Sequence, residues 1–262
     1  MVTIQKYVRA QSLEEAYTLN QARQNRIIGG MLWLKMSELR IGTAIDLCDL
    51  GLDTIEETDE EFRIGAMATL RMLETHQGLA RYTGGAAAEA VGSIVGVQFR
   101  NMATVGGSLW GRFGFSDVLT LFMAMDSYVE LYKGGIVPLA RFAAMKPDRD
   151  LLIRLIIKKV PGSFAYQSMR NQRTDLPVLA CAVSHWGGRV RIVVGARPHK
   201  AVLVLEEALP EGGLTPGAAK ALARKAAAAA VTGTNLRGSA AYRTHLIRVL
   251  AERGILALGG KA

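Results

Sequence analysis

The sequence predicts an α+β fold. Short strands and helices alternate along residues 1–158, whereas in residues 159–262 the strands come first and the helices follow. Two observations support this prediction. In the first part, a capped helix is followed at once by a short apolar strand that runs into Gly29-Gly30. After Pro161, strand-like runs come first and alanine-rich segments follow. That order is typical of a sheet and helices packed as separate layers.

The first elements are a helix and a strand. Ser12 and Glu15 form a capping box, and apolar residues then recur at helical spacing to about Gln24. Arg26 to Ile28 is expected to be a buried strand that ends at the glycine pair. A strand followed by a glycine turn places backbone N–H groups at the carboxyl edge of a sheet, where open α/β sheets bind ligands. A Gly-x-Gly-x-x-Gly pattern and a long following helix are both missing, which argues against a Rossmann fold.

Two small α/β lobes are expected within residues 1–158. Residues 32–36 and 44–47 are interpreted as short extended segments, and residues 53–61 as an acidic turn. We place the boundary between the lobes near residues 55–62.

The second lobe starts with a strand at Phe62 and a helix over 70–79, for which Thr69 is the expected N-cap. Its other predicted elements are helices at 86–91 and 119–124 and strands at 128–132 and 151–160.

The C-terminal domain, residues 159–262, is predicted to contain a three-stranded antiparallel sheet and helices. The expected strands are 164–170, 180–186 and 189–196, and Gly187-Gly188 forms the turn between the last two. Thr215-Pro216 is an N-cap followed by proline at the first helical position, which predicts a helix over 218–231. Ser239 is expected to start the last helix.

Composition limits the class of protein. The chain has 262 residues, 50% of them hydrophobic, and a net charge of +9. Its positive charges are spread along the chain without a basic stripe or aromatic platforms, so nucleic acid is not favoured as a partner. Cys48 and Cys181 are too few for a disulfide framework or a four-thiolate Fe–S cluster. With no signal-peptide pattern and no apolar run of about 18 residues, a cytoplasmic location is expected.

A second glycine pair, Gly106-Gly107, is the strongest candidate for a binding site. Glycine can adopt φ > 0 and lets a ligand approach the backbone closely. Thr104 and Ser108 place hydroxyls beside the pair, and Asp117 follows. Backbone N–H groups and hydroxyls suit a diphosphate, and a carboxylate suits ribose hydroxyls. An ordinary turn is the alternative.

The two glycine segments together resemble the FAD-binding (medium) subunit of molybdenum hydroxylases, the xanthine dehydrogenase and carbon monoxide dehydrogenase group. Residues 100–108 are similar to the family's Arg-Asn-x-x-Thr-Ile-Gly-Gly-Asn loop, and Gly29-Gly30 to the glycines of its Ala-Gly-Gly-x-x-Leu loop. Residues 239–246 resemble its C-terminal Ser-Ala-x-Tyr-Arg-x-x-Leu helix. The resemblance extends over essentially the whole chain.

The resemblance implies a two-lobed FAD-binding domain of the PCMH type, followed by the C-terminal domain. FAD would lie extended between the lobes. The cofactor-binding residues that it implies are Ile28, Gly29, Gly30, Met31, Leu32, Trp33, Thr69, Thr104, Gly106, Gly107, Ser108, Asp117, Leu152 and Gln167. For three of them a structural role is the alternative: packing for Trp33, a helix N-cap for Asp117 and a core position for Leu152.

Several residues depart from the family pattern. Met31-Leu32 replaces a polar pair, Leu70 replaces a histidine and Ser108 replaces an asparagine. Near the flavin, where many members carry a basic residue, this chain has Gln167, and either Arg170 or Arg173 could reach in instead.

The resemblance implies an electron-transfer subunit of an oxidoreductase. FAD would pass electrons between the 2Fe-2S clusters of an iron–sulfur subunit and an acceptor such as NAD, within a complex that includes a molybdopterin subunit. No residue is assigned as a catalytic acid or base or as a metal ligand. The alternative, motivated by the departures, is a flavin-free scaffold or assembly subunit with the same fold.

Ser108→Asn should tighten FAD binding if the asparagine contact of the family can be restored. Asparagine adds a donor and an acceptor, and one recovered hydrogen bond is worth roughly 0.5–1.5 kcal/mol, up to about tenfold in affinity. Titration of the apo-protein with FAD measures the change. Unchanged or weaker binding would mean that the site is built around serine.

Overall fold

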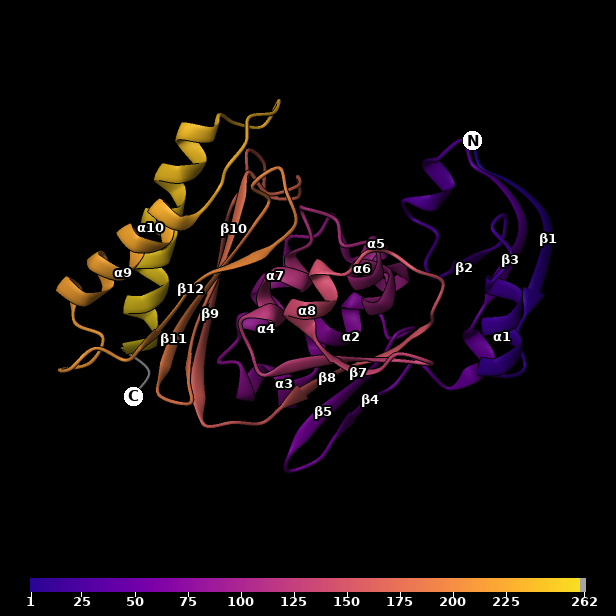
Figure 1. The fold of residues 1–262 in the computed structure, drawn as a ribbon, viewed down its shortest axis with the longest axis horizontal. Helices are drawn as coiled ribbons and strands as arrows, with labels where there is room; N and C mark the ends of the chain where they lie inside the picture. Colours follow the sequence, from indigo (N-terminus) through magenta and orange to yellow (C-terminus); the bar gives the residue numbers. More distant parts are fainter. Residues whose placement is uncertain (260–262) are drawn as a thin grey trace.

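The computed structural model describes residues 1–259. These residues form three β-sheets with their helices, and the sheets follow one another in sequence order along the longest axis of the molecule (Figure 1). The N-terminal sheet lies at one end of this view, and the C-terminal sheet with its two long helices lies at the other. In the described part of the chain, no helix combines the length and the apolar character needed to cross a membrane.

The first lobe is a parallel sheet with the strand order β1-β3-β2. Its elements are β1 (Thr3–Arg9), α1 (Leu13–Asn20), β2 (Arg26–Ile28) and β3 (Arg40–Asp46). As predicted, Ser12 caps α1, and its hydroxyl accepts the N–H of Glu15 at 3.1 Å. Ile28 pairs with Asp46, so β2 and β3 end at the same edge of the sheet. The Gly29-Gly30 segment therefore leaves from a carboxyl edge.

The segment after Gly30 is not extended as predicted. Residues 32–36 form a turn and the 3-10 helix η1 (Leu34–Met36). Leu, Lys and Met favour helical over extended backbone, and no neighbouring strand pairs with this segment to override that preference. A second 3-10 helix, η2 (Cys48–Leu50), follows β3.

The second lobe is an antiparallel sheet with the order β4-β5-β8-β6-β7. Its strands are β4 (Ile55–Glu57), β5 (Glu61–Gly65), β6 (Ser127–Leu131), β7 (Gly135–Pro138) and β8 (Leu152–Lys158). Residues 55–62, where we expected the boundary between the lobes, thus belong to a hairpin of this sheet. The chain crosses from the first sheet to the second in the preceding segment, residues 47–54.

Seven helices of the described chain pack in this lobe. They are α2 (Leu70–Thr75), α3 (Gln77–Tyr82), α4 (Ala86–Gly92), α5 (Val97–Met102), α6 (Val105–Trp110), α7 (Asp117–Met123) and α8 (Leu139–Ala144). Thr69 caps α2 as predicted, through the N–H of Met72 at 3.2 Å. The single helix expected over 70–79 is interrupted at His76, because its ring Nδ1 accepts the N–H of Leu79 at 3.1 Å and starts α3 there.

The C-terminal sheet is antiparallel with the order β12-β11-β10-β9. Its strands are β9 (Gly162–Met169), β10 (Leu179–Trp186), β11 (Arg189–Gly195) and β12 (Val202–Ala208). Gly187 and Gly188, with φ of 56° and 67°, form the predicted hairpin turn. The fourth strand, β12, was not predicted. Its apolar run is short and leads into Glu206-Glu207, which have low strand propensity, so pairing with β11 decides its structure.

Side chains of the central strand β10 alternate between two cores. Ala180 and Ala182 pack with the apolar core of the second lobe. Cys181 and Val183 pack under α9 (Pro216–Ala229) and α10 (Ala240–Gly259), which cover the outer face of the sheet (Figure 1). Because successive side chains of a strand point to opposite faces, this one sheet closes both cores.

Arg243 of α10 is fully buried, has no carboxylate partner within residues 1–259, and ties three segments together. Its guanidinium donates to the carbonyls of Val178 at 2.8 Å and Gly233 at 2.7 Å, and to the carbonyl of Gly238. It also donates to Asn235 Oδ1 at 2.6 Å. The cation is thereby solvated by the backbone of the loop that precedes α10.

Replacing Arg243 with methionine should lower the free energy of unfolding by about 3 kcal/mol, because several buried carbonyls lose their donors. The midpoint of urea unfolding measures this loss. Arg248→Met on the exposed face of the same helix is the control, and we expect it to change stability by less than about 0.5 kcal/mol. Equal effects of the two substitutions would contradict the bridging role of Arg243.

Candidate functional site: a cavity between the lobes

A cavity of about 860 Å³ lies where the two lobes and the C-terminal domain meet. This volume is in the range of ligand pockets, about 300–1,000 Å³. The first lobe contributes residues 26–34 to its lining. The second lobe contributes the segment around α6 and the start of α7, and the C-terminal domain contributes Arg170 and residues 174–176. Most of the predicted cofactor-binding residues are brought together here: Ile28, Gly29, Gly30, Met31, Leu32, Trp33, Thr104, Gly106, Gly107, Ser108, Asp117 and Leu152.

Gly29 and Gly30 allow the two glycine segments to touch. A Cβ on Gly30 would lie 1.8 Å from the carbonyl oxygen of Met102, and a Cβ on Gly29 would lie 2.6 Å from Thr104 Oγ1. Neither glycine has a positive φ. Gly30 lets one backbone approach another across the lobe boundary, and Gly29 makes room for the Thr104 side chain.

Gly106 and Gly107 lie in the first turn of α6, and neither adopts the positive φ that the sequence suggested. A Cβ on Gly106 would lie 2.7 Å from the carbonyl oxygen of Ala66, so this glycine packs α6 against the segment after β5. A Cβ on Gly107 would have one neighbour, Thr104 Oγ1 at 3.1 Å. Gly107 therefore keeps space free in the cavity itself.

The backbone donors on the two sides of the cavity differ. The first amides of α6 are already used: Val105 N–H donates to the Ala68 carbonyl, Gly106 N–H to the Ala66 carbonyl and Gly107 N–H to Thr104 Oγ1. By contrast, within the described residues 1–259 the N–H groups from Gly30 to Leu34 have no protein acceptor. Met31 in this run has a left-handed φ of 61°. Successive amides around a left-handed residue form an anion-binding concavity.

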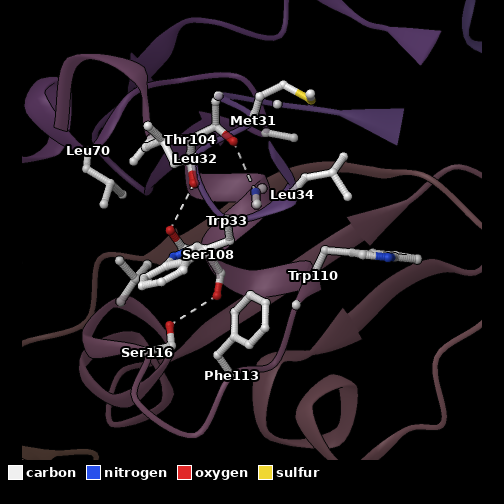
Figure 2. Close-up of a pocket in the computed structure, with 18 of the residues that line it drawn as sticks. Met31, Leu32, Trp33, Leu34, Leu70, Thr104, Ser108, Trp110, Phe113 and Ser116 are labelled. Carbon is white, nitrogen blue, oxygen red and sulfur yellow. Dashed lines mark hydrogen bonds between the residues drawn. The ribbon is translucent and has the colours of Figure 1, made fainter. Parts of the chain in front are cut away.

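Hydroxyl groups beside Gly107 are turned onto the backbone. Thr104 caps α6 by accepting the N–H of Gly107 at 3.1 Å. Ser108 Oγ donates to the Thr104 carbonyl at 2.9 Å, and Ser116 Oγ donates to the Ser108 carbonyl at 3.0 Å (Figure 2). Asparagine at position 108 would lose the bond from Ser108 Oγ to the Thr104 carbonyl. That loss would offset part of the affinity for FAD that its amide adds.

An aromatic group that the sequence analysis did not single out lines the cavity beside Trp33. The ring of Trp33 lies 5.5 Å from that of Phe115 and 6.3 Å from that of Phe99. Phe113 stacks on Phe115 at 5.2 Å. Trp33 and Phe113 remain 42% and 40% exposed, so apolar ring faces are available at the cavity. The Phe-Gly-Phe run just before Asp117 is the signal that could have found them.

Asp117 lines the cavity as the first residue of α7, and Ser116, not Asp117, is the N-cap. Its Oδ1 accepts hydrogen bonds from the hydroxyl of Tyr166 and, at 2.8 Å, from Nη2 of Arg170. Burial raises the pKa of the Asp117 carboxyl, and the Arg170 cation opposes that shift. Burial and the adjacent carboxylate raise the pKa of Tyr166 well above its usual value, which keeps the phenol protonated as a donor.

Two predicted residues do not reach the cavity. Thr69 uses its hydroxyl to cap α2, and its neighbour Leu70 lines the cavity instead. Gln167 pairs with Cys181 inside the C-terminal sheet, and Arg170 from the end of the same strand faces the cavity. Leu152 lines the cavity while 6% exposed, so its core and lining roles coincide.

Known proteins match the chain over nearly all of its length. A family model described as "FAD binding domain in molybdopterin dehydrogenase" matches residues 2–161, and one described as "CO dehydrogenase flavoprotein C-terminal domain" matches residues 164–258. The uncharacterized protein YgfM of Escherichia coli strain K12 is 28% identical over 254 residues, 94% of this chain and 93% of its own. The nicotine 6-hydroxylase medium subunit of Paenarthrobacter nicotinovorans is 24% identical and covers 98% of both chains.

Solved structures share the fold. Reconstituted CO dehydrogenase from Oligotropha carboxidovorans matches with a TM-score of 0.84 at 24% identity, over 98% of both chains. Quinoline 2-oxidoreductase from Pseudomonas putida 86 matches with a TM-score of 0.83 at 19% identity, over 98% of this chain and 97% of that one.

Gly107→Val should weaken FAD binding by about 10- to 100-fold, because the branched side chain fills space that the cofactor needs. Titration of the apo-protein with FAD measures the affinity, and the far-UV circular dichroism spectrum should stay unchanged. Gly217→Val is the matched control: Gly217 also lies in the first turn of a threonine-capped helix, but is exposed and outside the cavity. Normal FAD binding by Gly107→Val would show that the cofactor does not pass this glycine.

Proposed function

Because the chain belongs to the family of FAD-binding domains in molybdopterin dehydrogenases, we propose that it is the electron-transfer subunit of a molybdenum hydroxylase or dehydrogenase. In this role the chain binds FAD, and the FAD passes electrons between the iron–sulfur clusters of a partner subunit and an acceptor such as NAD. The family models show that the chain is an FAD-binding oxidoreductase subunit. What we propose is the direction of electron flow and the partners that take part in it.

The observation that supports the proposal most directly is the free run of N–H groups from Gly30 to Leu34 at the cavity. Backbone donors of this kind bind phosphate oxygens well, without a charged side chain. They fit the diphosphate of FAD although Met31 and Leu32 supply no polar group of their own. Opposite them, Gly107 leaves room for the ligand.

FAD, when bound, supplies the redox chemistry, since its isoalloxazine exchanges electrons one or two at a time. The chain contributes binding and orientation. The apolar faces of Trp33, Phe113 and Phe115 suit a planar ring system and exclude water from it. Among the carboxylates of the cavity, Asp117 is bound by Tyr166 and Arg170.

Asp150 at the same cavity accepts the N–H groups of Lys133 and Gly134. Its carboxylate and that of Asp117 thus have structural partners, which suits a subunit that needs no acid or base of its own.

The proposed partners follow from the family to which the chain belongs, whose model describes a domain of molybdopterin dehydrogenases. In the part of the chain that the structure describes, no group of three or more His, Cys, Asp or Glu is placed to hold a metal ion. The two cysteines also lie apart, with Cys48 exposed and Cys181 buried. On the basis of that family we propose an iron–sulfur subunit with 2Fe-2S clusters and a molybdopterin-binding large subunit as partners. The name of a relative, the nicotine 6-hydroxylase medium subunit, likewise describes one subunit of a larger enzyme.

The purified chain should carry about one FAD, as one cavity of this size predicts. Oxidised flavin bound in it should absorb near ~375 and ~450 nm. Release by heat, followed by chromatography against FAD and FMN standards, identifies the flavin. FMN, or no flavin after gentle purification with partners, would favour a scaffold subunit instead.

The electron path can be tested in the purified complex without knowing its substrate. Under anaerobic conditions NADH should reduce the iron–sulfur clusters, as seen in their electron paramagnetic resonance signal. Removal of FAD should abolish this reduction and re-addition should restore it. Cluster reduction by NADH in the FAD-free complex would refute the proposed role of this chain, and clusters that NADH never reduces would exclude NAD as the partner of the flavin.

A further inference from the structure

A segment of the C-terminal domain closes one side of the cavity. After β9, residues 170–178 return to β10, and Arg170, Thr174, Asp175 and Leu176 of this segment line the cavity. We call residues 171–177 the β9–β10 loop. Its position over the cavity depends on what holds it there.

Arg170 holds the loop from inside. Its guanidinium donates to Asp117 Oδ1 in the second lobe, to the carbonyl of Asp175 within the loop, and at 3.2 Å to Ser168 Oγ. The side chains of Arg170 and Asp117 are only 7% and 4% exposed. One side chain therefore joins the C-terminal domain, the FAD-binding domain and the loop.

A second arginine holds the loop from outside. Arg237 forms an ion pair with Asp175 Oδ1 at 3.3 Å, and its carbonyl accepts Asn171 Nδ2 at 3.4 Å. These bonds are longer and partly exposed, so Arg170 provides the stronger attachment. The exposed part of the loop is thus attached at Asn171 and at Asp175.

The charge of Arg170 also suits the cofactor. Asp117 is a buried carboxylate at a cavity that receives a diphosphate anion, and an unpaired charge there would repel the ligand and be costly to bury. Arg170 neutralises that carboxylate, and Tyr166 adds a second donor to the same oxygen, Oδ1. Among the described residues, the side-chain donors of Asp117 both bind Oδ1, and we assign Oδ2 as the oxygen that accepts a hydroxyl of the ligand.

From these contacts we propose that Arg170 is a positioning residue of the FAD site, acting through Asp117 and the β9–β10 loop. It fixes the carboxylate that faces the cofactor and holds the loop against the cavity. FAD binding and ordering of the loop are therefore thermodynamically coupled, and each favours the other. The proposal rests on the FAD site of the proposed function and is independent of the electron acceptor.

The test compares full-length apo-protein variants in titrations with FAD. Arg170→Gln should weaken FAD binding by about 10- to 100-fold, as expected for losing charged hydrogen bonds. Arg170→Lys, which keeps the charge but not the fork of donors, should recover part of the affinity. Arg173→Gln removes the same charge from an exposed position of the loop, and we expect a change of less than about fivefold.

Hydrogen exchange provides a readout that a purely structural role would not move. In the unmodified protein, FAD should slow exchange of residues 171–177, and in Arg170→Gln this protection should be lost while the C-terminal sheet stays protected. If Arg170→Gln fails to fold, Tyr166→Phe removes only one donor to Asp117 and should weaken FAD binding by about 3- to 10-fold.

Two outcomes would overturn the proposal. One is equal loss of affinity in Arg170→Gln and Arg173→Gln, which would indicate a general charge effect. The other is FAD binding by the unmodified protein without any change in exchange of the loop. Neither result bears on electron transfer to the acceptor. A failure of the proposed electron transfer would be seen in the other experiment, as a lack of reduction of the partner's iron–sulfur clusters by NADH.

Discussion

Two backbone segments of this chain approach each other more closely than any side chain would permit. Gly30 packs on the carbonyl of Met102, and Gly29 packs on the hydroxyl of Thr104. This contact joins the first lobe to the second at the edge where β2 and β3 end. It brings the N–H groups that follow Gly30 opposite the first turn of α6, and both segments line the cavity. The glycines thus act first on the arrangement of the lobes and only then on the ligand.

Much of the fold was predictable because its signals are short-range. Ser12, Thr69 and Thr215 cap helices as their positions suggested, and Gly187-Gly188 forms the expected hairpin. The α+β fold, the family and the FAD cofactor are confirmed by the matching family models. The two glycine segments could be connected from sequence only through the family resemblance, since more than 70 residues separate them. The conformation of Gly106 and Gly107 was misjudged because glycine also suits helix packing, as Gly106 shows.

The rest of the site depends on contacts between distant residues. Tyr166 and Arg170 lie 49 and 53 positions from Asp117, and no local pattern indicates that they bind its carboxylate. Equally, β12 becomes a strand only beside β11, and Gln167 is kept from the cavity by its register opposite Cys181. In each case the deciding partner is supplied by tertiary structure, which overrides the local preference of the segment.

The alternating side chains of β10 have a consequence for how the chain can be divided. Family models separate it into two domains near residue 162, yet Ala180, Ala182 and Val193 on one face of the C-terminal sheet complete the core that α7 and β8 begin. A fragment ending at this boundary would present an uncovered apolar surface to water, as would its complement. Such surfaces promote aggregation. The two halves are therefore separable as sequence modules in evolution, but as expressed fragments each would need the other to remain in solution.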